Sequence, residues 1–87
     1  MRIRFIGPFE KLAGKEMELA LESPITLREL IGCLSRRAEG FTAYNQLKTD
    51  EALAAHVMFL RGGRNLKLDD RVRAEDQVDV VLPVTGG

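Results

Sequence analysis

The sequence predicts an α+β fold: a mixed sheet of four to five strands with one main helix on one face. Three observations predict it. Two segments near the N-terminus alternate apolar and polar residues, the next segment has apolar residues at helical spacing, and a strongly apolar segment lies near the C-terminus. A helical crossover between the first and last strands would place them side by side and parallel.

The first two expected strands are residues 2–6 (RIRFI) and the segment 16–22 (EMELALE). In the first, Ile3 and Phe5 lie on the face opposite the arginines, and in the second, apolar residues alternate with glutamates. The connection between them contains glycine and proline and is read as a loop. Because this connection is short, the two strands are expected to pair antiparallel.

The main helix is expected from residue 27, with its end at Gly40. Thr26 is placed as the N-cap, and Glu29 three residues later completes a capping box. Apolar residues recur at helical spacing and predict the buried stripe, which consists of Leu27, Leu30, Ile31, Leu34 and Ala38.

The segment 41–55 has a mixed pattern, which we interpret as a loop with one short helical turn around residues 51–55. A third strand is expected at residues 57–61, running into a tight turn at Gly62-Gly63. The sequence LKLDD, residues 66–70, is read as a short fourth strand.

The last strand is expected at residues 78–82, and its apolar residues on both faces favour the middle of the sheet. A parallel central pair with one helix across one face describes a β-grasp (ubiquitin-like) roll, since an open ferredoxin-like sheet needs a second long helix. We therefore expect a domain at residues 1–82 and a flexible C-terminal tail at residues 83–87, which ends in Gly-Gly.

Composition excludes several classes of function. The 87 residues suffice for one domain, and 13 basic residues balance 13 acidic ones, which disfavours nucleic-acid binding. No apolar stretch reaches the ~20 residues that cross a bilayer, and no signal peptide is apparent, so a cytoplasmic protein is expected. With one cysteine and one histidine, neither a disulfide framework nor a metal site is expected.

Individual side chains give no support for catalysis. Cys33 lies about 120° from the centre of the apolar stripe and is read as a partly exposed thiol, and His56 is read as a surface residue at a strand end. Arg61 and Arg64 flank the two glycines, but the glycines are explained by a tight turn. The acidic pairs are assigned to turns: Asp69, Asp70, Glu75 and Asp76.

The ending LPVTGG draws attention to the main chain. A C-terminal carboxylate becomes a reactive acyl donor once another protein uses ATP to form a mixed anhydride with AMP. Glycines suit such a tail because they lack Cβ and thread through a narrow channel, and Pro83 helps to end the strand. Two terminal glycines arise by chance in about one chain in 200, although chain ends are also commonly disordered.

On these features the chain resembles the MoaD/ThiS-type sulfur carriers, a family of ubiquitin-like proteins that includes the small subunit of molybdopterin synthase. The matching stretches are MRIRF, FEKLAGKEMEL, ITLRELIGCL and EDQVDVVLPVTGG. Chain length, the F..LAG loop and the PVTGG ending resemble that small subunit most.

The resemblance implies that an adenylating enzyme similar to a ubiquitin-activating enzyme uses ATP to activate Gly87, which is then converted to a thiocarboxylate. The sulfur would pass to a pterin precursor in the large synthase subunit, where it forms the dithiolene that binds molybdenum or tungsten. The chain itself would be a non-catalytic small subunit or sulfur-donor co-substrate, with no bound cofactor.

The resemblance also implies site residues. Gly87 would react, and the arm that delivers it would consist of Gly86, Thr85, Val84 and Pro83. Ile6 and Val81, with Met58 or Leu60, are expected to form an apolar group on the sheet face away from the helix, where partners bind. Burial of this group under residues 41–55 is the competing interpretation.

Three other functions stay open at this point. The chain could be a protein modifier joined through Gly87 to lysines of target proteins. It could carry sulfur for another product, such as thiamine or a thiolated tRNA base. It could also be a β-grasp interaction domain whose tail is incidental.

Overall fold

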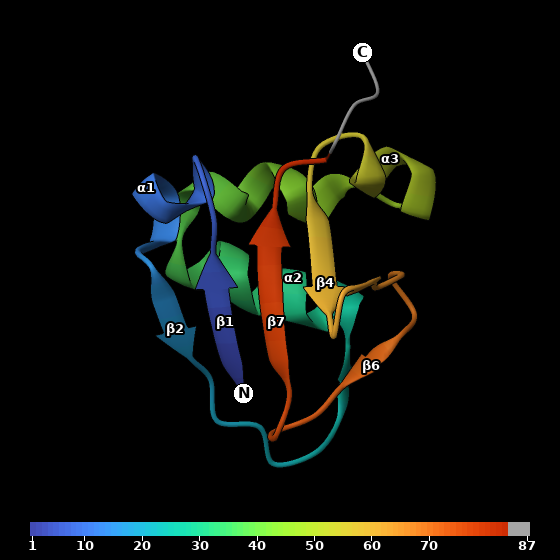
Figure 1. Ribbon diagram of the computed structural model, residues 1–87. Coiled ribbons are helices and arrows are strands. Elements are labelled where there is room, and N and C mark those ends of the chain that lie inside the picture. Colours follow the sequence, from blue (N-terminus) through green and yellow to red (C-terminus); the bar gives the residue numbers. More distant parts are fainter. Residues whose placement is uncertain (84–87) are drawn as a thin grey trace.

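The two alternating segments near the N-terminus form antiparallel strands (Figure 1). In the computed structural model, which describes residues 1–83, β1 spans Arg2–Phe5 and β2 spans Glu16–Glu18. This confirms the expected antiparallel pairing. The second strand is shorter than expected, because its contact with the start of the chain ends where the Leu19 amide donates to the Met1 carbonyl, at 2.9 Å.

Part of the connection that was read as a loop is a short helix, α1, spanning Phe9–Ala13. The Phe9 ring is buried, and its centroid lies 5.8 Å from that of Phe41 and 6.1 Å from that of Tyr44. The partner rings come from a distant part of the chain, so the local glycine and proline signals could not reveal this packing. The loop expectation was wrong for these residues.

The segment with helical spacing forms α2, Leu27–Arg37. Both bonds of the capping box are present, since the Glu29 amide donates to Thr26 Oγ1 at 3.2 Å and the Thr26 amide donates to Glu29 Oε1 at 3.0 Å. All five residues of the expected stripe are buried. The helix ends before Gly40, because the backbone is extended at Ala38.

The segment 41–55, read mostly as a loop, contains two helical pieces. The 3₁₀ helix η1 spans Glu39–Gln46, and α3 spans Asp50–Ala54. In η1 the Phe41 ring is fully buried, with its centroid 5.6 Å from that of Phe5. Burial of this ring holds the segment against the core, and η1 runs behind the sheet (Figure 1). Only the helical turn near residues 51–55 was expected.

The third expected strand is β4, Met58–Arg61, which forms a hairpin with β5, Arg64–Asn65. The two residues between them, Gly62 and Gly63, have φ of 59° and 79°. Positive φ at both positions is the geometry of a type I′ turn and suits glycine. The tight turn at Gly62-Gly63 is confirmed.

A second, two-stranded sheet was not expected. It pairs β3, Ile25–Thr26, with β6, Arg71–Val72. The expected strand at residues 66–70 is absent, because Asp70 Oδ2 accepts the Lys67 amide at 2.8 Å and closes a turn there.

The last strand, β7, spans Gln77–Val81 and lies in the centre of the main sheet, whose order is β2-β1-β7-β4-β5. It runs parallel to β1 and antiparallel to β4. Val78 and Val80 face the helices and are fully buried. This five-stranded mixed sheet with helices on one face is the expected α+β, β-grasp roll (Figure 1).

Within residues 1–83, no helix has the length and apolar character needed to cross a membrane. The division into a domain at residues 1–82 and a tail at 83–87 stays a prediction, because residues 84–87 lie outside the described part of the chain.

Candidate functional site

The end of β7 is the point where the chain leaves the centre of the sheet. The Val80 carbonyl accepts the Ile6 amide at 3.0 Å, and Val81 is the last residue in register with β4. Leu82 follows and is 50% exposed. Pro83 has no N–H to donate to a neighbouring strand, which helps to end the pairing. The tail therefore starts from a rigid, central strand.

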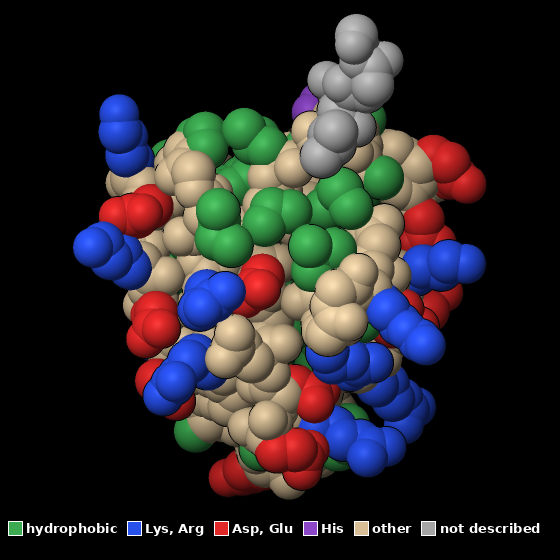
Figure 2. Space-filling model, in the orientation of Figure 1, with side chains coloured by type: hydrophobic (Ala, Val, Ile, Leu, Met, Phe, Trp, Pro, Cys, Tyr) green, Lys and Arg blue, Asp and Glu red, His purple; other side chains and the backbone are tan. Residues whose placement is uncertain are grey.

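An apolar row crosses the outer face of the sheet at this end. Val81 lies opposite Met58 of β4, and Ile6 continues β1 beside Val81 because Phe5 pairs with Val80. Side chains alternate between the faces of a strand, so the row points away from the buried Phe5 and Val80. Figure 2 shows hydrophobic side chains gathered on this face next to the start of the tail.

The competing interpretation, in which residues 41–55 cover this row, is wrong. Those residues pack on the helical side, where η1 contacts α2 and Phe41 enters the core. Ile6 is 43% exposed, and Met58, Leu60 and Val81 are partly exposed.

Two further exposed apolar side chains lie at the same end and were missed by the sequence interpretation. Leu12 of α1 is 45% exposed, and Leu82 follows β7. With Ile6, they are the large hydrophobic residues that are exposed among residues 1–83. We call the following set the tail-end surface: Ile6, Leu12, Met58, Leu60, Val81 and Leu82.

Charged residues border the tail-end surface on the outer face. Arg4 donates to both carboxylate oxygens of Asp79, from Nε at 3.1 Å and from Nη2 at 3.4 Å. Further from the tail, Arg2 pairs with Glu18 at 3.1 Å. An apolar centre with a charged rim is the usual composition of a protein–protein interface.

The other tail residues singled out by the sequence cannot be placed. Val84, Thr85, Gly86 and Gly87 lie outside the described residues, and their roles stay predictions.

Cys33 and His56 are the two side chains that the sequence analysis read as non-catalytic. Cys33 is partly exposed on α2, and Arg36 Nη2 lies 3.3 Å from its Sγ. His56 is exposed between α3 and β4. Among residues 1–83, no hydrogen bond joins Cys33 to an imidazole or a carboxylate that could act as its base.

Two of the four acidic residues assigned to turns, Asp70 and Asp76, close turns as expected, whereas Asp69 forms an ion pair with Arg28. Asp76 Oδ2 accepts the Arg73 amide and the Arg61 guanidinium, both at 2.9 Å. Burial raises the pKa of Asp76, but these hydrogen bonds and the two positive charges outweigh burial, so the pKa lies below its usual value. A carboxylate held ionised in this way stabilises a turn and is a poor general acid.

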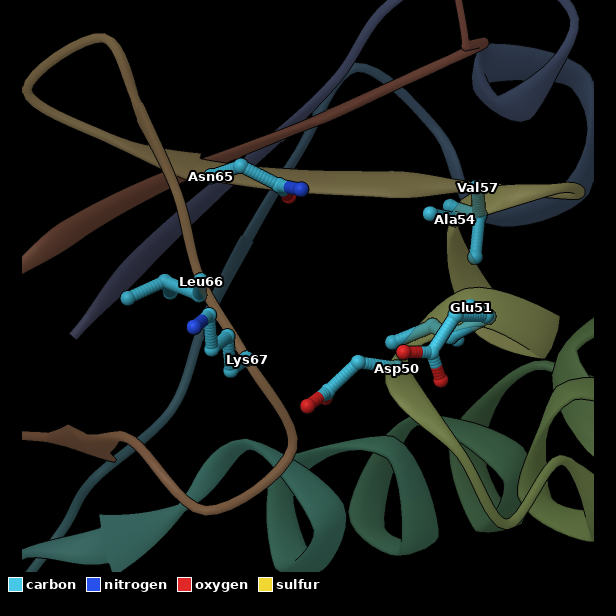
Figure 3. Close-up of a pocket in the computed structure, with 8 residues that line it drawn as sticks. Asp50, Glu51, Ala54, Val57, Asn65, Leu66 and Lys67 are labelled. Atoms are coloured by element: carbon cyan, nitrogen blue, oxygen red, sulfur yellow. The ribbon is translucent and has the colours of Figure 1, made fainter.

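A hollow of about 200 Å³ lies between α3 and the segment after β4 (Figure 3). Asp50 and Glu51 border one side, and Asn65 and Lys67 border the other. Asp50 Oδ1 accepts the Leu68 amide at 2.7 Å, so this acid holds the loop. In the described part of the chain, no cluster of histidine, cysteine or acidic side chains has the arrangement of a metal site.

Comparison with known proteins gives a family match over almost the whole chain. The model of the ThiS family matches residues 3–87, which includes the two final glycines. No protein with a curated description matches the sequence significantly.

Three solved structures have similar folds. A protein from Pyrococcus furiosus, provisionally named molybdopterin converting factor, subunit 1, is 25% identical, with a TM-score of 0.75 and coverage of 95% of each chain. SAMP1 from Haloferax volcanii is 19% identical, with a TM-score of 0.72 over 99% of this chain and 97% of that one. The HVO 2177 protein of Haloferax volcanii is 22% identical, with a TM-score of 0.72 over 99% and 84%.

Proposed function

Since the chain belongs to the ThiS family, we propose that it is a sulfur carrier whose C-terminal Gly87 is converted to a thiocarboxylate. The observation behind this proposal is the family match, which continues through Gly86 and Gly87. A cytoplasmic location stays a prediction.

The chemistry proposed for Gly87 proceeds in two steps. A carboxylate oxygen attacks the α-phosphorus of ATP, which forms an acyl-adenylate and releases pyrophosphate. Hydrosulfide then attacks the acyl carbon and AMP leaves, and loss of the S–H proton makes the terminal group a thiocarboxylate. The adenylating enzyme supplies the catalytic groups for both steps.

The geometry of β7 supports this role. The strand pairs with β1 on one side and β4 on the other, so backbone hydrogen bonds on both sides hold the strand from which the tail starts. Leu82 and Pro83 start an arm that leads away from the core. A tail of this kind reaches into a partner's active site while the folded domain stays outside.

The tail-end surface gives such a partner a place to bind. Exposed apolar side chains cluster beside the origin of the tail, and burying them excludes water from the mouth of the partner's active site. We propose that the adenylating enzyme and the sulfur acceptor use this surface in turn. Val81 and Ile6 are its central residues.

We further propose that the acceptor is the large subunit of molybdopterin synthase, so that the sulfur enters the molybdenum or tungsten cofactor. The structural neighbour named molybdopterin converting factor, subunit 1, at 25% identity, favours this product over thiamine or a thiolated tRNA base.

The proposal is tested by reconstitution with the ubiquitin-activating-like enzyme of the same organism, ATP and sulfide. Intact-mass analysis should give a product in which one oxygen is exchanged for sulfur. Deleting Gly87 should abolish the product, while an Arg37→Gln variant, changed on the exposed end of α2, should react normally. Unmodified protein after ATP has been consumed would overturn the proposal.

A second assay separates the acceptors. Capture of the native protein from cells should recover the large synthase subunit bound without a covalent bond. Recovery of isopeptide-linked conjugates at target lysines would favour the protein modifier. An unchanged cofactor level in cells that contain only the Gly87 deletion would favour an interaction domain with an incidental tail.

A further inference from the structure

Three arginines surround one aspartate at the end of the sheet opposite the tail. Arg61, Arg71, Arg73 and Asp76 line a hollow of about 240 Å³. Arg61 ends β4, Arg71 begins β6, and Asp76 directly precedes β7. Figure 2 shows Lys and Arg side chains gathered on this lower part of the molecule, away from the grey tail.

The cluster is held in place by its own hydrogen bonds. Arg61 Nη1 donates to the Arg71 carbonyl at 2.6 Å and to Asp76 Oδ2 at 2.9 Å, and the Arg61 side chain is only 38% exposed. The Arg73 amide donates to the same carboxylate oxygen. The backbone that carries Arg71 and Arg73 is thus fixed before any ligand arrives.

The charges in this hollow do not balance. Asp76 neutralises one guanidinium, which is that of Arg61. The side chains of Arg71 and Arg73 are exposed and form no hydrogen bond or ion pair with any of residues 1–83. Hydrogen bonds from the Thr26 amide, at 3.0 Å, and the Thr26 hydroxyl, at 3.1 Å, lower the pKa of Glu29, and the charge of Arg71 lowers it further without forming an ion pair.

We propose that Arg71 and Arg73 bind an acidic, Asp- or Glu-rich segment of a partner protein. A guanidinium binds a carboxylate through two parallel hydrogen bonds. The lining contains no aromatic side chain on which a nucleobase could stack. Asp76 also lines the hollow, so a phosphate placed between the two arginines would be repelled by its carboxylate. The carboxylates of a peptide are separate, and each can bind one arginine.

This surface works independently of the tail. β7 separates the two, and its five residues span about 16 Å at roughly 3.3 Å per residue. A partner bound through the arginines leaves the tail-end surface accessible. The chain can therefore be retained by one protein while the tail visits the active site of another, and the arginine site does not depend on the chemistry proposed for Gly87.

The test is a titration of ¹⁵N-labelled protein with a short polyglutamate peptide, followed by amide chemical shifts. The shifts should concentrate on residues 61–76. In an Arg71→Gln/Arg73→Gln double variant, binding should weaken about fivefold. The matched control is Arg36→Gln/Arg37→Gln, which removes the same charge from the end of α2 and should leave binding unchanged. The spectrum of each variant reports whether it is folded.

Two further ligands distinguish an acidic peptide from a phosphate or a nucleic acid as the class of ligand bound. Inorganic phosphate and a short single-stranded oligonucleotide are titrated at the same ionic strength. Weaker shifts at residues 61–76 with both would support the acidic segment. Tighter binding of either, equal loss in both double variants, or peptide shifts spread evenly over all basic residues would overturn the proposal.

Discussion

The most informative substitution on the tail-end surface is Ile6→Asp. Ile6 is 43% exposed in the free protein, and full burial of an isoleucine side chain contributes about 1.5–3 kcal/mol. Burying the exposed part in an interface therefore contributes about 1 kcal/mol, so Ile6→Ala should weaken partner binding about fivefold. Asp adds the desolvation of an unpaired carboxylate, several kcal/mol, and should weaken binding more than about 100-fold.

The Ile6→Asp substitution should lower the free energy of unfolding only moderately. The part of Ile6 already buried contributes about 1–2 kcal/mol to the free energy of unfolding, so Ile6→Asp should lower that free energy by this amount and leave the domain folded. Binding is measured by calorimetry against the adenylating enzyme, and unfolding by urea titration. The control is Arg2→Gln, which lies on the same outer face at the other end of β1 and leaves no carboxylate facing Glu18. Affinities of Ile6→Asp and wild type within twofold of each other would refute the reasoning.

Three further predictions concern the fold. Phe41→Ala should lower the free energy of unfolding by about 3–5 kcal/mol, because the ring is fully buried; Tyr44→Phe should change it little, and a loss below 1 kcal/mol for Phe41→Ala in a urea titration would contradict the core role of η1. Thr26→Ala should lower it by about 1 kcal/mol by removing the capping box, and an unchanged urea midpoint would argue against that cap. Asp76 has a folded pKa below its usual 3.8, so its stabilisation is present above that value and is lost as pH falls through the folded pKa. Asp76→Asn should therefore be less stable at pH 7 and should have a flatter stability profile below about pH 4; parallel profiles for the two proteins would contradict this.

Local sequence patterns were sufficient to predict the elements whose apolar residues recur with a clear strand or helix period. Ile3 and Phe5 in the first strand, and the apolar stripe of α2, needed no knowledge of distant residues. The segment 41–55 was different, because its helical form depends on Phe41 packing against Phe5 and Phe9 from another part of the chain. A mixed pattern of apolar and polar residues without a clear period looks like a loop when it is read locally.

In the candidate site, too, some residues could be predicted from local patterns and others depend on distant parts of the chain. The outer-face positions of Ile6 and Val81 could be predicted because strand parity assigns them, and their role in partner binding stays a prediction. Leu12 was missed because its segment was read as a loop, and a loop has no defined face. The arginine hollow was also missed, since Arg61, Arg71 and Arg73 meet only through the pairing of β6 with β3 and the turn before β7.

The central claim is that Gly87 is the reactive end of a sulfur carrier. The most direct measurement is fragmentation mass spectrometry of the C-terminal peptide of the protein isolated from its own cells during cofactor synthesis. The account predicts a peptide that ends at Gly87, with a fraction in which one terminal oxygen is replaced by sulfur. A peptide that continues past Gly87, or one that ends there with only a free carboxylate, would contradict it.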